Sequence, residues 1–307
     1  MARDGGVGSW IERRARRSPE RIAIVHGGVQ RTYRELAARI IRLANALRDH
    51  GVGRGDRVVW LGANHPAFLE LLFATAKLGA VLAPINHRLD PGAIETISRN
   101  YEPVLVVTDP AEVEQMIVTG GDGAIDEAIA LDTLCILHHT SGTTGTPKGI
   151  MLTHGNVTWN VINFLSVADF REDDRTVAIA PFFRSGGLGV NVLTVLFKGG
   201  TVIVPETATP EAILDAMTVH RVTIGFGNPD LLDALTRCAA WPNADLSSIR
   251  AFMTGGAPVP ERLLRTYLDR GITFLQGYGL SEAAPLVLLL DPDHALRKVG
   301  SAGTPPL

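Results

Sequence analysis

The sequence predicts an α/β protein with two Rossmann-like subdomains, each built on a mostly parallel sheet that is flanked by helices. The main observation is an alternation along the chain of 307 residues, in which short apolar runs of strand type are followed by longer segments with helical periodicity. Strands that alternate with helices form parallel sheets through crossover connections. The apolar content of 46% and the charged content of 20% fit a globular chain with a substantial core.

The first subdomain is expected to cover residues 1–108. It begins with a hairpin, because a short apolar run at 22–25 is followed by two glycines. Thr32 and Glu35 have the spacing of a capping box, which opens a helix. The remaining predicted elements are strands at 57–61, 80–84 and near 104–108, and a helix at 67–78.

Residues 109–132 form the least regular stretch and are expected to connect the two subdomains at the surface. The second subdomain then spans 133–307. Its predicted strands lie near 176–180, 201–204, 222–226, 250–253 and 272–276, and its predicted helices near 187–197, 210–219, 229–238 and 260–269.

Composition excludes several classes of protein. The net charge of −3 offers no basic field, so a nucleic-acid partner is not expected. The chain has two cysteines, Cys135 and Cys238, which support no disulfide framework and favour a reducing compartment. No apolar run approaches the roughly 18–20 residues that span a bilayer. We therefore expect a cytoplasmic protein, while peripheral membrane contact and a homodimer stay open.

Residues 140–149 read Thr-Ser-Gly-Thr-Thr-Gly-Thr-Pro-Lys-Gly and form the most informative segment of the chain. Glycines allow close approach of the backbone to a ligand, and backbone N–H groups, hydroxyls and a lysine together suit a polyphosphate. Apolar runs of strand type flank the segment, so it is expected to join two strands as a hairpin. A Walker-type loop opens directly into a helix after Gly-Lys-Ser/Thr, whereas here Gly149 and a strand follow Lys148.

The same segment, 139–149 with 151–156, resembles the phosphate-binding signature of adenylate-forming enzymes, a superfamily of acyl-CoA synthetases, luciferases and adenylation domains of peptide synthetases. Three further segments resemble motifs of this superfamily in the expected order. They are 76–86, Thr-Gly-Gly-Ala-Pro at 254–258 and Gln-Gly-Tyr-Gly-Leu-Ser-Glu at 276–282. The resemblance implies the large N-terminal domain of the adenylate-forming fold.

The resemblance also implies a site for ATP and Mg²⁺. The β- and γ-phosphates would be held by Ser141, Gly142, Thr143, Thr144, Gly145 and Lys148. Thr140 and Glu282 would help to place Mg²⁺, which prefers hard oxygen ligands. The adenine would lie beside Gly255, Gly256, Ala257 and Pro258, with Tyr278 stacked on its face. Gln276, Gly277, Gly279 and Ser281 complete the nucleotide motif, and Ser281 keeps the hydroxyl for the α-phosphate where the family usually has threonine.

Arg184 marks a departure from the family pattern. The segment 181–189 resembles a motif in which a histidine commonly follows the phenylalanine, and that histidine is associated with the acyl pocket and the thioester-forming step. Arginine carries a permanent charge, so Arg184 could pair with an acidic group of the substrate or with a phosphate of CoA. A salt-bridged or solvent-facing arginine with no catalytic part is the alternative. A metal cluster of His138, His139 and His154 is not expected, because neighbouring residues of a strand point to opposite faces.

The leading functional prediction is ATP-dependent activation of a carboxylic acid, first of all a fatty acid, to acyl-AMP and then to acyl-CoA. Catalysis would rest on positioning and charge neutralisation, with Lys148, Glu282 and Arg184 as the catalytic candidates. The alternatives are an aryl- or dicarboxylate-CoA ligase, an acyl-AMP ligase, or a non-catalytic nucleotide- or acyl-binding module. The family's ribose-binding aspartate, hinge and C-terminal domain with its catalytic lysine would follow residue 307, so we expect impaired activity of this chain.

Overall fold

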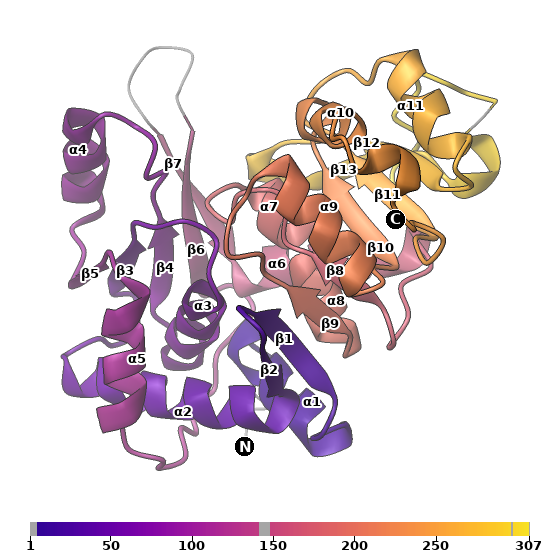
Figure 1. The fold of residues 1–307 in the computed structure, drawn as a ribbon. Helices are drawn as coiled ribbons and strands as arrows, with labels where there is room; N and C mark the ends of the chain where they lie inside the picture. The colour runs from indigo at the N-terminus through magenta and orange to yellow at the C-terminus, as the bar shows by residue number, and fades with distance from the viewer. Residues whose placement is uncertain (1–4, 141–147, 296, 307) are drawn as a thin grey trace. The chain divides into compact units, whose positions relative to one another are not determined.

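A computed structural model describes residues 5–140, 148–295 and 297–306. The fold is of the mixed α/β class with three sheets, in which most neighbouring strands are parallel, as predicted (Figure 1). Contacts divide the chain into two compact units, Met1–Arg21 with Arg31–Trp159 and Ile22–Gln30 with Asn160–Leu307. The predicted boundary at 109–132 does not coincide with this division. The strands on either side of residues 141–147 group with the first unit, because one of them pairs with a strand of the first sheet.

The first unit contains a five-stranded sheet in the order β5-β3-β4-β6-β7. The strands are β3 (Arg57–Trp60), β4 (Val81–Pro84), β5 (Leu105–Val107), β6 (Leu134–Thr140) and β7 (Lys148–Thr153). Strands β3 and β4 are buried along nearly their whole length, as expected of strands that are covered on both faces. Strand β7 runs antiparallel to its neighbour β6.

The helices of the first unit begin at clear capping residues. Thr32 and Glu35 form the predicted capping box of the second helix, and Asp90 and Asp109 cap the fourth and fifth. The elements are η1 (Val7–Ser9), α1 (Trp10–Arg17), α2 (Tyr33–Asp49), α3 (Pro66–Leu78), α4 (Pro91–Tyr101) and α5 (Pro110–Thr119). Thus a helix occupies the first part of the stretch that was predicted to be irregular. The sequence does carry its signal, because Asp109, Pro110 and Glu112 are typical of a helix start.

His154 connects the start of the chain to the end of β7 within the first unit. Its side chain is fully buried, and its Nδ1 atom accepts a hydrogen bond of 3.0 Å from the backbone N–H of Val7. Its Nε2 atom is buried without a hydrogen-bond partner. Burial, assisted by the positive charge of Arg54, lowers the pKa of His154 from 6.5 to about 4.

Acid is therefore expected to destabilise the first unit. Above pH 6.5 the imidazole is neutral in both states, whereas between pH 6.5 and about 4 only the unfolded chain takes up the proton. Stability should fall in this window, by about 2 kcal/mol at pH 5. Urea unfolding at pH 7 and pH 5 measures this loss. The His154→Gln variant should show a smaller loss, and an equal loss in both proteins would contradict the assignment.

The second unit contains two four-stranded sheets, in the orders β2-β1-β9-β8 and β10-β11-β12-β13. The strands of the first are β1 (Ile22–His26), β2 (Val29–Thr32), β8 (Arg175–Val177) and β9 (Thr201–Ile203). Those of the second are β10 (Ile224–Gly227), β11 (Ala251–Thr254), β12 (Thr273–Gly279) and β13 (Leu286–Leu289). Strands β10, β11 and β12 are parallel, and β13 runs back along β12.

The helices of the second unit follow the predicted alternation. They are α7 (Ser185–Gly189), α8 (Val192–Lys198), α9 (Pro210–Val219), α10 (Pro229–Thr236) and α11 (Glu261–Leu268), with short turns η2 (Trp241–Asn243), η3 (Ser281–Ala283) and η4 (Pro292–His294). Helix α6 (His154–Val167) passes from the first unit into the second.

The helix predicted at 187–197 is in fact two helices, α7 and α8, which are separated at Val190 and Asn191. The Asn160 side chain donates to the carbonyl of Gly189, and the Asn191 side chain donates to Thr176 and to the carbonyl of Val177. The bond from Asn160 engages a backbone carbonyl that a continuous helix would use, and the Asn191 side chain is held by residues outside the helix.

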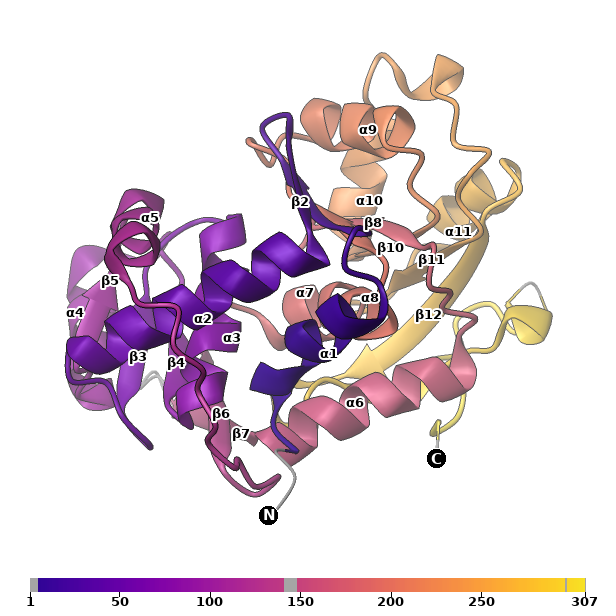
Figure 2. The same ribbon diagram turned by 90° about the horizontal axis from the view of Figure 1, so that it is seen from below.

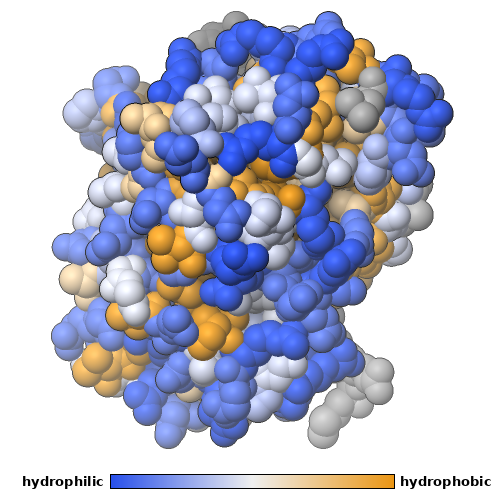
Figure 3. All heavy atoms as spheres, turned by 45° about the vertical axis from the view of Figure 1, so that its right-hand side comes forward, coloured by the Kyte–Doolittle hydropathy of each residue, from blue (hydrophilic) through white to orange (hydrophobic). Residues whose placement is uncertain are grey.

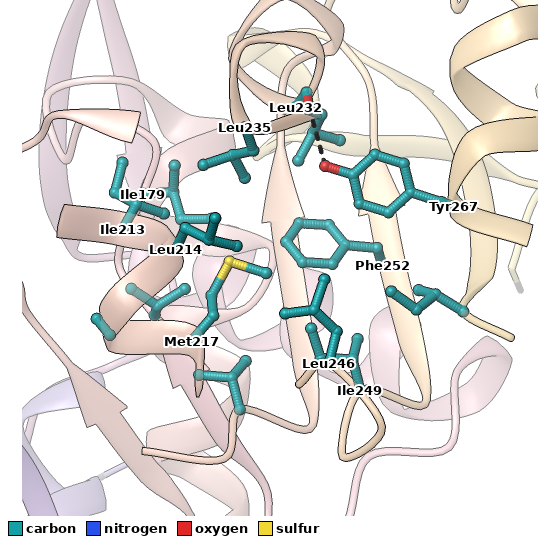
Figure 4. Close-up of a cluster of buried hydrophobic side chains, with 14 of the residues drawn as sticks. Ile179, Ile213, Leu214, Met217, Leu232, Leu235, Leu246, Ile249, Phe252 and Tyr267 are labelled. Carbon is teal, nitrogen blue, oxygen red and sulfur yellow. Dashed lines mark hydrogen bonds between the residues drawn. The ribbon is translucent and has the colours of Figure 1, made fainter. Parts of the chain in front are cut away.

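A large core of the second unit joins strands β1, β8, β9, β11 and β12 to helices α9, α10 and α11, which can be followed in Figure 2. Phe252 and Tyr267 meet at its centre, with ring centroids 5.8 Å apart. The buried hydroxyl of Tyr267 donates to the carbonyl of Leu232 at 2.9 Å (Figure 4). This packing holds the carboxyl ends of the three parallel strands in place.

Hydrophilic side chains make up most of the surface drawn in Figure 3. Among the described residues, none of the helices is both long and apolar enough to cross a membrane.

Candidate nucleotide-binding site

The predicted hairpin around the glycine- and threonine-rich segment is confirmed. Strands β6 and β7 are antiparallel, and Thr140 pairs with Lys148 at the open end of the ladder. Lys148 is exposed. The predicted phosphate ligands Ser141, Gly142, Thr143, Thr144 and Gly145 lie outside the described residues. Because a strand rather than a helix begins at Lys148, the hairpin is not a Walker-type loop.

The end of β7 continues into α6 through a reciprocal cap. The Thr153 hydroxyl accepts a hydrogen bond from the Asn156 backbone at 3.1 Å, and the Asn156 side chain accepts one from the Thr153 backbone at 2.9 Å. Thr153 and Asn156, which belong to the segment that resembles the phosphate-binding signature, therefore have a structural role.

The parallel pairing of three strands in the second unit ends in register. Gly227 of β10 pairs with Thr254 of β11, which pairs with Gln276 of β12. Thr254 and Gln276 each follow a core phenylalanine by two residues, so their side chains lie on the same face of the sheet. The carboxyl ends of parallel strands are where open α/β sheets bind ligands.

Thr254 and Gln276 carry unsatisfied polar atoms at this edge. Thr254 is 1% exposed, and both its hydroxyl oxygen and the Oε1 atom of Gln276 are buried without a hydrogen-bond partner. Buried polar atoms of this kind call for a bound water or ligand. A hydroxyl beside a carboxamide suits a group with neighbouring donor and acceptor atoms, such as the amino edge of adenine. Thr254 was not among the predicted site residues, although it directly precedes Gly255.

The residues that follow this last pair, Gly255 and Gly277, touch each other. A Cβ atom at Gly255 would lie 2.9 Å from the carbonyl oxygen of Gly277, so glycine permits this approach. Gly256 has a φ of +86° and is exposed, as are Ala257 and Pro258. The predicted adenine loop and the predicted nucleotide motif are thus brought together within one unit.

Tyr278 and Glu282 are both accessible on the nucleotide motif. The Tyr278 side chain is 54% exposed, which leaves a ring face open for stacking. Glu282 lies in η3, is exposed and forms no ion pair within the part of the chain that the structure describes. One accessible carboxylate fits Mg²⁺, which commonly binds through one or two carboxylates and the phosphates of its substrate.

Arg184 lies next to the same motif. It is the residue before α7, its side chain is exposed, and it forms no ion pair with any residue in the described ranges. The hydroxyl of the following residue, Ser185, donates to the hydroxyl of Ser281 at 3.0 Å. Among the described ion pairs none involves Arg184, so of the predicted alternatives the solvent-facing arginine with no catalytic part remains beside the substrate-pairing one.

The three histidines do not assemble a metal site. His138 is buried, and the neighbouring residue His139 is only half-buried on the other face of β6. No group of three or more potential His, Cys, Asp or Glu ligands occurs within residues 5–140, 148–295 and 297–306.

Comparison with known proteins agrees with the motifs. The AMP-binding enzyme family matches residues 11–307, and the chain belongs to this family. It is 47% identical over 318 residues to feruloyl-CoA synthase of an Amycolatopsis species, covering 99% of this chain and 65% of that protein. It is 32% identical over 325 residues to the long-chain-fatty-acid–CoA ligase FadD13 of Mycobacterium tuberculosis, covering 97% of this chain and 64% of that protein.

The fold comparison gives the same result. The crystal structure of the inhibitor-bound N-terminal domain of FACL13 from Mycobacterium tuberculosis superimposes with a TM-score of 0.90 at 30% identity, covering 97% of this chain and 81% of that chain. The chain thus spans about two thirds of the length of the curated relatives named here, and its fold matches that of an N-terminal domain.

Proposed function

We propose that the chain is the nucleotide- and acyl-binding part of an ATP-dependent CoA ligase that activates an aryl carboxylic acid of the ferulate type. The observation that carries this proposal is the gap in identity between two relatives, 47% to a feruloyl-CoA synthase and 32% to a long-chain-fatty-acid–CoA ligase. The proposed substrate differs from the leading prediction from sequence, which was a fatty acid. It corresponds to one of the predicted alternatives, an aryl acid.

The proposed reaction has two steps. A carboxylate oxygen of the acid attacks the α-phosphorus of ATP, the bond to pyrophosphate breaks, and an acyl-AMP forms. The thiol of CoA then attacks the acyl carbon and AMP leaves. Both steps bring charged groups together without a protein nucleophile, so the chain acts by positioning the reactants and neutralising their charge.

The residues of the second unit would hold the adenosine end. Tyr278 offers a ring face to the base, while Thr254 and Gln276 supply the unsatisfied buried donor and acceptor atoms. Ser281 would donate to the α-phosphate. Lys148, with the residues 141–147 before it, would hold the β- and γ-phosphates, and Glu282 would hold Mg²⁺, which supplies charge neutralisation on the phosphates when bound.

Arg184 would guide the acid to the α-phosphate. Its exposed guanidinium has no ionic partner within the described ranges, and Arg184 directly precedes Ser185, which contacts Ser281. A planar guanidinium pairs well with a carboxylate through two hydrogen bonds. Charge attraction between Arg184 and the substrate would therefore bring the carboxylate towards the phosphorus that it attacks.

The substrate class is tested with stable acyl-adenylate analogues, in which a sulfamoyl group replaces the phosphate. We expect the feruloyl analogue to displace a fluorescent ATP analogue at a concentration at least tenfold lower than the palmitoyl analogue, a difference of about 1.4 kcal/mol. The two analogues share the adenosine part, so their ratio reports the acyl site alone. Tighter binding of the palmitoyl analogue would restore the fatty-acid alternative.

A further inference from the structure

The hydroxyl groups of Ser185 and Ser281 form a hydrogen bond across 96 residues of sequence. Ser185 Oγ donates to Ser281 Oγ at 3.0 Å, and the Ser185 side chain is buried while Ser281 is partly accessible. An oxygen that already accepts a hydrogen bond is polarised, so its own proton becomes a better donor. The bond thus leaves the Ser281 proton available for a group outside the protein.

Both serines sit on backbone that is firmly held within the second unit. The turn before α7 is closed by a hydrogen bond from the Arg184 backbone to the Pro181 carbonyl at 3.1 Å. On the other side, the carbonyl of Ser281 accepts from the backbone of Ala284 at 3.1 Å. What the backbone leaves free is rotation of the Ser281 side chain about χ1.

The Asn160 side chain ties the two segments together. It donates to the carbonyl of Gly189 at the end of α7, at 2.9 Å, and accepts from the backbone of Leu286 at 3.2 Å. Asn160 therefore holds helix α7 and the segment 281–286 together. The distance between the two serines thus depends on these hydrogen bonds as well as on the bond between their hydroxyls.

A serine at position 281 has more rotational freedom than the threonine that the motif usually carries. A β-branched side chain is restricted at χ1, whereas serine populates three staggered rotamers. We propose that Ser185 is a positioning residue that compensates for the missing methyl group, because its hydrogen bond selects the rotamer in which Ser281 donates to the α-phosphate. This inference rests on the proposed function and assigns a role to Ser185, which was not among the site residues predicted from the sequence.

A double-mutant cycle with AMP and adenosine as probes tests the proposal. Calorimetric titration of the chain with AMP should show about fivefold weaker binding for Ser185→Ala, because the Ser281 hydroxyl is then free to rotate. Adenosine, which lacks the phosphate, should bind the variant as it binds the unmodified chain. In the Ser281→Thr background, the same Ser185→Ala change should weaken AMP binding by less than twofold.

The control and the other outcomes separate this role from a structural one. Ser248→Ala also removes a partly buried serine hydrogen bond, the one from Ser248 to the carbonyl of Val222 at 2.8 Å. This variant should leave AMP binding unchanged. The proposal is overturned if Ser185→Ala leaves AMP binding intact, if adenosine binding falls equally, or if threonine at 281 does not reduce the loss. Failure of the unmodified chain to bind AMP would instead refute the proposed function, and this inference with it.

Discussion

Replacement of Gly279 by alanine is expected to remove most of the affinity for AMP and to destabilise the second unit by roughly 3 kcal/mol. A Cβ atom at this position would lie 2.0 Å from the carbonyl oxygen of Pro285, which is backbone and cannot turn aside as a side chain can. The strand end and the segment after it would have to separate. That separation would break the hydrogen bond of 3.1 Å from the Leu280 backbone to the same carbonyl and would displace Ser281 and Glu282.

Urea unfolding and an AMP titration measure the two effects. Gly121→Ala is the matched control, because a Cβ atom at Gly121 meets nothing within 4 Å and its φ is not positive. The control should unfold within about 0.5 kcal/mol of the unmodified chain and bind AMP equally. If Gly279→Ala binds AMP like the control, the nucleotide motif does not depend on this close approach.

The parts of the candidate site that the sequence indicates are those whose signal is local. The phosphate-loop hairpin follows from two apolar runs around a polar segment, and the structure shows the two antiparallel strands. The motifs at 254–258 and 276–282 were found as continuous strings of residues. Parallel pairing of β11 with β12, in which the two motifs begin, explains why they meet.

The features that were missed depend on contacts between distant segments. The bond between Ser185 and Ser281 spans 96 residues, and no pattern in either segment predicts it. In the sequence, Thr254 resembles an ordinary strand residue. Its importance appears only from the structure, in which it pairs with Gln276 and both residues carry an unsatisfied polar atom. The grouping of 22–30 with the second unit likewise follows from pairing between β1 and β9, which local periodicity does not contain.

The acyl group of the substrate does not follow from the sequence motifs. The sequence alone placed fatty acids first, with aryl and dicarboxylic acids as alternatives. The identity of 47% to a feruloyl-CoA synthase favours an aryl acid, and Arg184 suits any carboxylate. The motifs thus indicate the reaction class, whereas the substrate within that class is to be identified by measurement.

Exchange of labelled pyrophosphate into ATP tests the central claim most directly, because it reports reversal of acyl-AMP formation and needs no CoA. The Lys148→Ala variant should exchange roughly 100-fold more slowly, since one cation that faces the transferred phosphates is lost. Lys298→Ala, which removes another exposed lysine, should exchange as the unmodified chain does. We expect exchange that depends on added ferulate and exceeds that with palmitate; ATP binding without exchange for any carboxylic acid would contradict the account and identify a non-catalytic nucleotide-binding module.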